Sequence, residues 1–131
     1  MVRQWPVQQA IYGAMTADAT LMAMVTGIFD GADQNQQLPY ITIGESTGTA
    51  DDLVIETGAQ TTHTMQVWDK SQGMAKVKQI MDRITVVLHR KQLTITGTQA
   101  VECVLEFAET FRDADGETRR GAMRFRVATF G

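Results

Sequence analysis

The sequence predicts an α+β fold: a mostly antiparallel sheet that carries a long helix and a shorter N-terminal helix on one face, plus an extended hairpin arm. Apolar residues recur with the helical period of about 3.6 residues over 74–88. Apolar and polar residues alternate over 61–68, 101–107 and 123–127, which is typical of strands with one buried face. With 131 residues, 44% of them apolar and 21% charged, we expect a single globular domain over residues 1–131.

Two helices are expected at the start of the chain. Pro6 suits the first turn of a helix, and a second, shorter helix is predicted from about Asp18 to Val25, closed by Gly27. Ile28–Phe29 predicts a short strand that ends in a turn at Asp30–Gly31. The apolar stripe of the first helix consists of Val7, Ala10, Ile11, Ala14 and Met15.

Two strands and an ambiguous segment follow. Pro39 precedes a β-branched strand over 40–44. Residues 45–59 are rich in Gly, Thr and Asp, so this segment is either an extended hairpin arm or a mobile loop. Residues 61–68 alternate again and predict the next strand. One face of this strand carries His63, Met65 and Val67, and the other carries Thr62, Thr64, Gln66 and Trp68.

The longest helix is expected after this strand. Ser71 is placed to cap it, and Leu93–Thr96 predicts a short strand after it. Charged residues, among them Lys76, Lys78 and Arg83, lie off its apolar stripe. That stripe consists of Met74, Val77, Ile80, Met81, Ile84, Val87 and Leu88.

Two long strands end the chain as a hairpin. Asp115–Gly116 between alternating segments predicts the turn. Matching the apolar faces of the two strands places Leu105 opposite Phe125. The same register puts Glu106 opposite Arg124 on the other face, a favourable cross-strand pair. The outer face of the sheet is therefore expected to carry Trp68, Glu106, Arg124 and Arg126.

Charge is distributed unevenly along the chain. The net charge of −3 argues against a protein whose main task is to grip nucleic acid. Residues 30–69 contain seven acids and no Lys or Arg, whereas residues 70–91 contain six bases and one acid. These segments are either two solvated faces that neutralise each other, or an acidic and a basic side suited to head-to-tail packing in a ring. A basic cluster at Arg119–Arg120 likewise either pairs with Glu106 and its neighbours or docks an acidic partner.

The residue types that carry chemistry are few and scattered. His63 is expected to be packed on an apolar strand face, and His89 ends the long helix, where its positive form would complement the dipole. Cys103, the only cysteine, is expected to be an inert core thiol in a protein of cytoplasmic origin. Residues 113–117 lack the ligand positions of a calcium loop, and Gly44–Gly48 lacks the Lys of a phosphate loop. We therefore predict no enzyme activity, metal or cofactor.

A membrane or secretory role is also unsupported. No apolar run reaches the roughly 18 residues of a membrane span, and residues 1–6 lack the apolar stretch of a signal peptide. By elimination, the protein is expected to act through its surfaces.

The order of segments resembles the family of phage tail-completion proteins, which includes tail-to-head joining proteins and gene-transfer-agent tail terminators. The similarity covers nearly the whole chain. The segments that carry it are residues 7–15, 21–25, 28–30, 38–44, 63–68, 88–89 and 111–121.

The resemblance implies a virion protein, assembled in the bacterial cytoplasm, that forms a ring (a hexamer) at the head-proximal end of the tail. Such a ring would halt polymerisation of the tail tube protein and present a surface to the head-completion (stopper) protein. DNA would pass through its channel without specific binding. The alternatives are a head-completion or connector protein of the neck and, from another class, a small cytoplasmic enzyme or ligand-binding domain.

Interface candidates can be named from the charge pattern, although the family supplies no active residues to transfer. They fall on the expected arm, on the long helix and at the terminal hairpin. They are Asp51, Asp52 and Glu56; Lys76, Lys78 and Arg83; and Arg112, Arg119 and Arg120.

Overall fold

The computed structural model describes residues 4–31, 35–52, 57–95 and 99–130, with the side chains of 49–52, 57–58, 99–101 and 130 outside this description. Three helices and five strands make up the described chain. They are α1 (Gln4–Thr16), α2 (Ala19–Met24), β1 (Ile28–Phe29), β2 (Tyr40–Asp52), β3 (Thr57–Asp69), α3 (Ala75–Leu88), β4 (Gln99–Arg112) and β5 (Arg119–Phe130).

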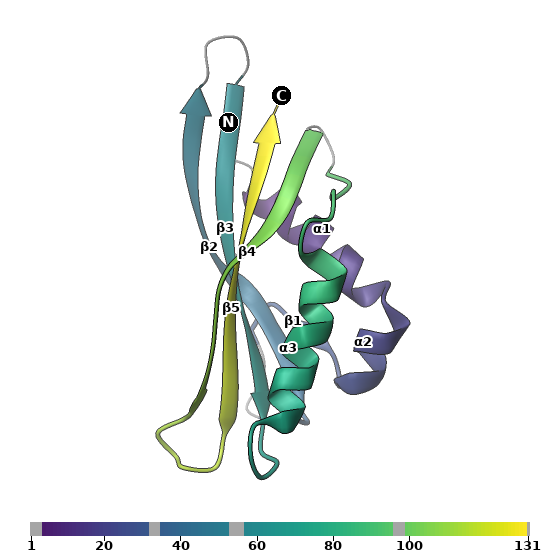
Figure 1. Ribbon diagram of the computed structural model, residues 1–131, viewed down its shortest axis with the longest axis vertical. Helices are drawn as coiled ribbons and strands as arrows, with labels where there is room; N and C mark the ends of the chain where they lie inside the picture. Colours follow the sequence, from purple (N-terminus) through teal and green to yellow (C-terminus); the bar gives the residue numbers. More distant parts are fainter. Residues whose placement is uncertain (1–3, 32–34, 53–56, 96–98, 131) are drawn as a thin grey trace.

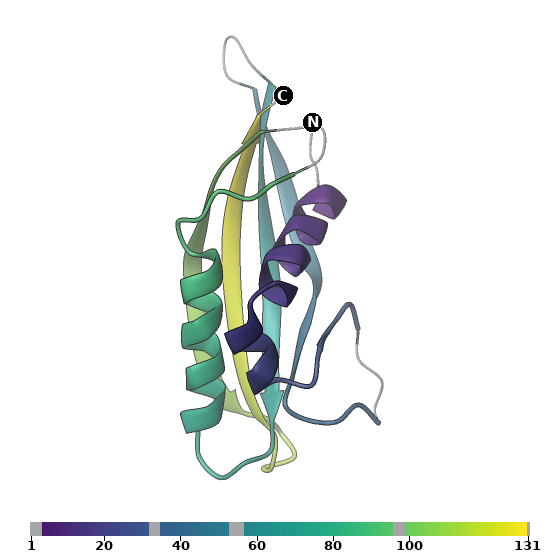
Figure 2. The ribbon, with the colours of Figure 1, turned by 90° about the vertical axis from the view of Figure 1, so that its right-hand side faces the viewer.

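The strands form one sheet in the order β1-β2-β3-β5-β4. Every neighbouring pair is antiparallel except β1 and β2, which are parallel. All three helices lie on the same face of this sheet, and the other face carries none of them (Figures 1 and 2). The α1 helix contacts β2 and β3, whereas α3 contacts β3, β4 and β5. The predicted α+β class, with two main helices on one face, is confirmed.

The core lies between the helices and the covered face of the sheet. On β3 the predicted alternation is confirmed, because Met65 and Val67 are fully buried while Gln66 and Trp68 are only partly buried. Each buried aliphatic or aromatic side chain contributes roughly 1.5–3 kcal/mol relative to exposure. The apolar side chains of the helices and sheet that have no exposed surface are Val7, Ile11, Met15, Leu21, Ile41, Met65, Val67, Val77, Ile80, Ile84, Leu88, Cys103, Phe125 and Val127.

The terminal hairpin has the predicted partners at its centre, but its register changes along its length. Leu105 lies opposite Phe125, as predicted. Arg124 lies opposite Phe107 and not opposite Glu106, because a β-bulge between Leu105 and Phe107 inserts an extra residue into β4. Glu106 nevertheless reaches Arg124, at 3.3 Å. A second β-bulge in β4 lies between Ala100 and Glu102.

The segment that was either an arm or a loop is a hairpin arm. Pairing of β2 with β3 continues from Tyr40–Trp68 to Asp52–Thr57. The arm is not free-standing, because β3 also pairs with β5 as far as Gly58 and Phe130. The register shifts beside Gly44, whose φ of 155° is one that residues with a side chain rarely adopt.

Two local predictions are wrong. Ser71 does not cap α3; Met74 occupies the N-cap position, and Ser71 hydrogen-bonds the Asp69 carboxylate through its hydroxyl and its backbone N–H. Leu93 and Ile95 are buried but lie in no strand, since the only bridge described there joins Lys91 to Cys103. Thr96, the last residue of that expected strand, lies outside the described residues.

Helix ends differ slightly from expectation. The α1 helix is already formed at Gln4, two residues before Pro6. The α2 helix ends at Met24, and Asp18 is its N-cap, with a carboxylate oxygen accepting from the Leu21 N–H at 2.9 Å.

Candidate functional site

The acidic candidates belong to the far end of the β2–β3 hairpin. The backbone of Asp51 lies opposite Gly58, and that of Asp52 lies opposite Thr57. Glu56 lies outside the described residues. The paired ends of β2 and β3 are at the opposite end of the molecule from the β4–β5 turn (Figure 1).

The basic candidates on α3 differ in how free they are. Lys76 and Lys78 are exposed near the start of the helix. Arg83 is not free, because its Nε and Nη2 donate to the two carboxylate oxygens of Asp18 at 2.8 and 2.7 Å. Arg83, and next the Leu21 N–H, lower the pKa of Asp18 to about 2. The Arg83 side chain therefore ties α3 to the start of α2 and is occupied within the chain.

The basic candidates at the terminal hairpin are also mostly engaged. Arg119 donates through Nη1 to the backbone carbonyls of Gly116 and Glu117, at 3.2 and 2.8 Å. Arg120 forms an ion pair with Asp113 at 2.8 Å. Arg112 is exposed, and the part of the chain that the structure describes gives it no charged partner.

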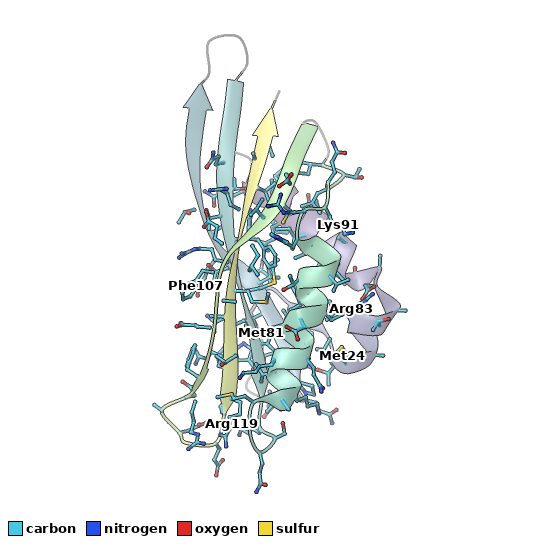
Figure 3. The ribbon with its side chains drawn as sticks, in the orientation of Figure 1. Met24, Met81, Arg83, Lys91, Phe107 and Arg119 are labelled. Carbon is cyan, nitrogen blue, oxygen red and sulfur yellow. The ribbon has the colours of Figure 1, made fainter. Side chains whose placement is uncertain are left out.

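The candidates that the structure describes therefore do not form one site. The hairpin acids lie at one end of the elongated molecule, whereas the start of α3 and the β4–β5 turn, with Arg119, lie at the other (Figures 1 and 3). Among the described side chains, no ion pair joins an acid of residues 30–69 to a base of residues 70–91. Two bases of residues 70–91, Arg83 and Arg90, instead pair with Asp18 and Glu102, which lie outside the acidic segment.

The uncovered face of the sheet holds a row of side chains that the sequence did not reveal. Arg120 stacks on Trp68, with its guanidinium carbon 4.0 Å from the ring centroid, and lies 5.3 Å from the Phe111 ring. Trp68 in turn stacks on Tyr40 at 6.0 Å, and Tyr40 meets Phe29 edge-on at 6.1 Å. These five residues come from five different strands, so the row crosses the whole sheet.

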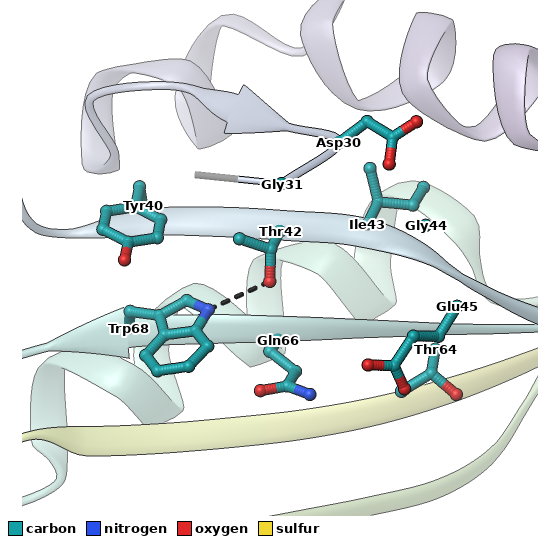
Figure 4. Close-up of a pocket in the computed structure, with 10 residues that line it drawn as sticks. All are labelled: Asp30, Gly31, Tyr40, Thr42, Ile43, Gly44, Glu45, Thr64, Gln66 and Trp68. Carbon is teal, nitrogen blue, oxygen red and sulfur yellow. Dashed lines mark hydrogen bonds between the residues drawn. The ribbon is translucent and has the colours of Figure 1, made fainter. Parts of the chain in front are cut away.

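A shallow groove of about 390 Å³ runs beside this row. Tyr40, Thr42 and Trp68 line one part of it, and the Trp68 indole donates to the Thr42 hydroxyl at 2.9 Å (Figure 4). Glu45 and Asp30 add acidic groups to the lining. The groove has polar and aromatic walls but no convergent set of catalytic groups, so it is suited to contact and not to chemistry.

Alternation alone predicted that Trp68 faces outward, but it could not supply the partners of Trp68. Those partners depend on cross-strand register: Trp68 lies opposite both Tyr40 and Arg120, and Phe111 lies opposite Arg120. The signal that could have found them was the aromatic–arginine spacing across the two hairpins, once their registers were known.

Potentially reactive groups are buried or used for structure. Burial lowers the pKa of His63 to about 4 and raises the pKa of Cys103 to about 12, so the thiol is inert at neutral pH. His89 Nδ1 accepts a hydrogen bond from the Leu105 N–H at 3.0 Å, which ties the end of α3 to β4. Hydrogen bonds from Thr118, and next from the Glu117 N–H, lower the pKa of Asp115 to about 2, so this carboxylate is engaged within the β4–β5 turn.

Metal binding and membrane crossing find no support in the described residues. Within residues 4–31, 35–52, 57–95 and 99–130, no three His, Cys, Asp or Glu side chains are grouped as metal ligands. No helix in that part of the chain has the length and apolar character needed to cross a membrane.

Comparisons with known proteins agree with one another. A family model described as "Tail completion protein gp17" matches residues 9–129. The tail completion protein gp17 of Bacillus phage SPP1 is 26% identical over 120 residues, covering 92% of this chain and 89% of that protein.

Two solved structures share the fold. A chain in the "Virion of native gene transfer agent (GTA) particle" aligns with a TM-score of 0.87 at 23% identity, covering 95% of each chain. The "Structure of bacteriophage SPP1 gp17 protein" aligns with a TM-score of 0.63 at 25% identity, covering 92% of this chain and 86% of that one.

Proposed function

Because this chain belongs to the tail completion protein gp17 family, we propose that copies of it form a ring, a hexamer, at the head-proximal end of a tail tube. The family consists of structural tail proteins and not of enzymes. In our proposal the ring stops polymerisation of the tube protein and offers the surface on which the head-completion protein docks. The observation that carries the proposal is the match over residues 9–129, nearly the whole chain.

The geometry supports a role in assembly. The molecule is elongated, with the backbone of Asp51 and Asp52 near one end and the exposed side chains of Lys76 and Arg112 near the other. One entire face of the sheet is uncovered and carries aromatic and arginine side chains. A subunit that must contact its own copies, a tube and a neck protein needs several distinct surfaces of this kind.

The hairpin arm has a proposed task of its own. If Asp51, Asp52 and Glu56 face the channel of the ring, their charges repel DNA phosphates and let DNA slide through without specific binding. The triple variant Asp51→Asn, Asp52→Asn, Glu56→Gln is expected to slow DNA packaging or ejection. Glu117→Gln, an exposed acid at the other end of the molecule, is the matched control. Unchanged packaging and ejection in the triple variant would show that the arm does not have this role.

Removal of the gene tests the main proposal. Without a terminator, tube polymerisation continues past its normal length, so electron micrographs of lysates should show overlong or headless tails. Restoring the gene on a plasmid should return tails to normal length.

Tails of normal length that merely fail to join heads would contradict the proposal and point to a head-completion or connector protein. Purified protein should also decorate one end of purified tail tubes in negative-stain images. Decoration along the whole tube, or none, would count against a terminator.

A further inference from the structure

Two grooves lie where the helical layer meets the sheet, one beside α1 and one beside α3. The α1 helix lies toward the β1–β2 edge of the sheet, and α3 lies toward the β4 edge (Figure 2). The first, which we name the aromatic groove, has a volume of about 510 Å³. Trp5, Tyr12 and Phe29 line it, with Ile28 and Ile43. Trp5 and Tyr12 are seven residues apart and therefore project from one side of α1.

The second groove lies between α3 and β4 and has a volume of about 480 Å³. We name it the α3–β4 groove. Small side chains, Thr85 and Ala108, form part of its walls, and Met81, Leu105 and Met123 contribute apolar surface. The charged side chains of Lys78, Asp82 and Glu109 also line it, so this groove offers room and mixed apolar and polar walls, where the aromatic groove offers bulky side chains.

The exposure of the aromatic side chains needs an explanation. Trp5 is 58% exposed and Tyr12 is 46% exposed, although both sit beside the apolar residues Ile28 and Ile43. Clustered exposed aromatics of this kind are typical of the centres of protein–protein contacts. Their burial in a neighbour would remove this apolar surface from water.

The charges of the two sides are complementary. No Lys or Arg occurs between Gln4 and Asp69. The charged residues of the α1–β1–β2 side are therefore all acids, and they include the exposed Asp30 and Glu45. The other side consists of α3, the loop after it and β4. Among its described side chains that form no ion pair, bases outnumber acids. The bases are Lys76, Lys78, Lys91 and Arg112, and the acids are Asp82 and Glu109.

We propose that Trp5 and Tyr12 of one copy insert into the α3–β4 groove of the next copy. This inference rests on the ring proposed above and identifies the two surfaces that meet in it. The two grooves differ in shape, and the two sides of the molecule around them differ in charge, so each fits the other groove and not a second copy of itself. Such a contact is heterologous, and repeating it around an axis closes a ring.

Two blocking variants test this pairing. Tyr12→Glu disables the aromatic groove, and Ala108→Glu fills the α3–β4 groove and adds a repelling charge. Both positions are exposed, so the fold should survive, and circular dichroism checks this. Each variant alone should lose ring formation in analytical ultracentrifugation and on tube ends. Ala23→Glu, at an exposed alanine of α2 outside both grooves, should assemble like the wild type.

Mixing the two blocked variants gives the sharpest result. Each retains one working groove, so together they should form a one-to-one pair of twice the monomer mass that cannot grow. A disulfide crosslink between a Gln9→Cys copy and a Glu109→Cys copy traps the contact even where it is weak, since Cys103 is buried. Two Gln9→Cys copies should not crosslink to each other.

Other results overturn the inference in distinguishable ways. Intact rings of Tyr12→Glu, or no crosslink between the two cysteine variants, would show that these grooves do not meet, while the ring itself stands. If Tyr12→Glu forms normal rings that no longer bind tail tubes, the aromatic groove contacts the tube protein and not the next copy. A wild-type protein that remains monomeric and forms no ring, even when tail tubes are present, would overturn both this inference and the proposed function.

Discussion

The two faces of the sheet are built by alternate residues of the same strands, but they differ in what surrounds them. On the covered face, Phe125 and Met65 are fully buried beneath the helices. On the bare face, Phe107 is 42% exposed and Arg124 lies 5.3 Å from its ring. The same residue type therefore does different work on β4 and β5, according to the face on which it falls.

This difference shows that alternate residues of the same strands serve two purposes, folding and contact with partners. Burial on the covered face supplies the folding free energy, and the partly exposed rows on the bare face remain free to meet partners. The comparison predicts that substitutions on the covered face act on stability, whereas those on the bare face leave the monomer almost intact.

The largest effect is expected from Phe125→Ala. Truncating a fully buried phenylalanine leaves a cavity and should lower the free energy of unfolding by about 3–5 kcal/mol. Phe107→Ala is the matched control, because it removes the same ring from the bare face and should cost at most about 1 kcal/mol. Urea denaturation measures both, and equal losses would break the distinction between the two faces.

A pH effect is the next largest and comes from His63 on the covered face. Burial lowers its pKa from 6.5 to about 4. Between these values the unfolded chain binds a proton that the folded chain does not, so stability falls as pH drops from 6.5 to 4. The loss should approach about 3 kcal/mol, relative to a His63→Leu variant that lacks this titration.

The control for this experiment is Thr61→Val, which replaces a buried hydroxyl on the same strand and leaves the histidine in place. Its unfolding free energy should depend on pH like that of the wild type. Parallel pH profiles for His63→Leu and the wild type would mean that His63 is not a neutral core residue.

A smaller effect is expected from Arg120→Ala on the bare face. The change removes the stack on Trp68 and the ion pair with Asp113, and it should cost about 1 kcal/mol. Arg120→Lys keeps the charge but loses the planar stack, so it should recover only part of the loss. Chemical denaturation followed by circular dichroism reports on both, and full recovery by lysine would assign the energy to the ion pair alone.

The smallest effect is expected from Glu106→Gln. Glu106 pairs with Arg124 and Arg126 at 3.3 Å each, but both arginines are nearly half exposed. Solvent and salt screen such pairs, so the loss should be about 0.5 kcal/mol or less and should vanish in about 1 M salt. A larger, salt-independent loss would mean that the bare face contributes to folding as the covered face does.

Several features could be predicted from local sequence because they depend on local sequence. The inward position of Met65 and the outward position of Trp68 follow from strand alternation, and the buried stripe of α3 follows from helical periodicity. The Leu105–Phe125 pair follows from a turn at Asp115 and two matching apolar faces. The bulge beside Phe107 left no comparable signal, so the predicted Glu106–Arg124 register was displaced by one residue.

Other predictions failed because they depend on which partner a side chain or a segment finds in the folded chain. Ser71 has the right side chain for a helix cap, but Asp69 engages it. Leu93 and Ile95 alternate like a strand and are buried, yet they pair with no strand in the described chain. Among the candidate residues, Arg83 and Arg120 looked equally available until Asp18 and Asp113 were found beside them.

The sequence by itself determined most of the buried residues, where most of the helices and strands lie, and that charge is unevenly distributed along the chain. Only the tertiary structure decided that β5 lies between β3 and β4, and that α1 and α3 flank opposite edges of the sheet. The physical reason is range: periodicity reflects which side of one element avoids water, whereas strand order and groove composition depend on contacts between distant segments.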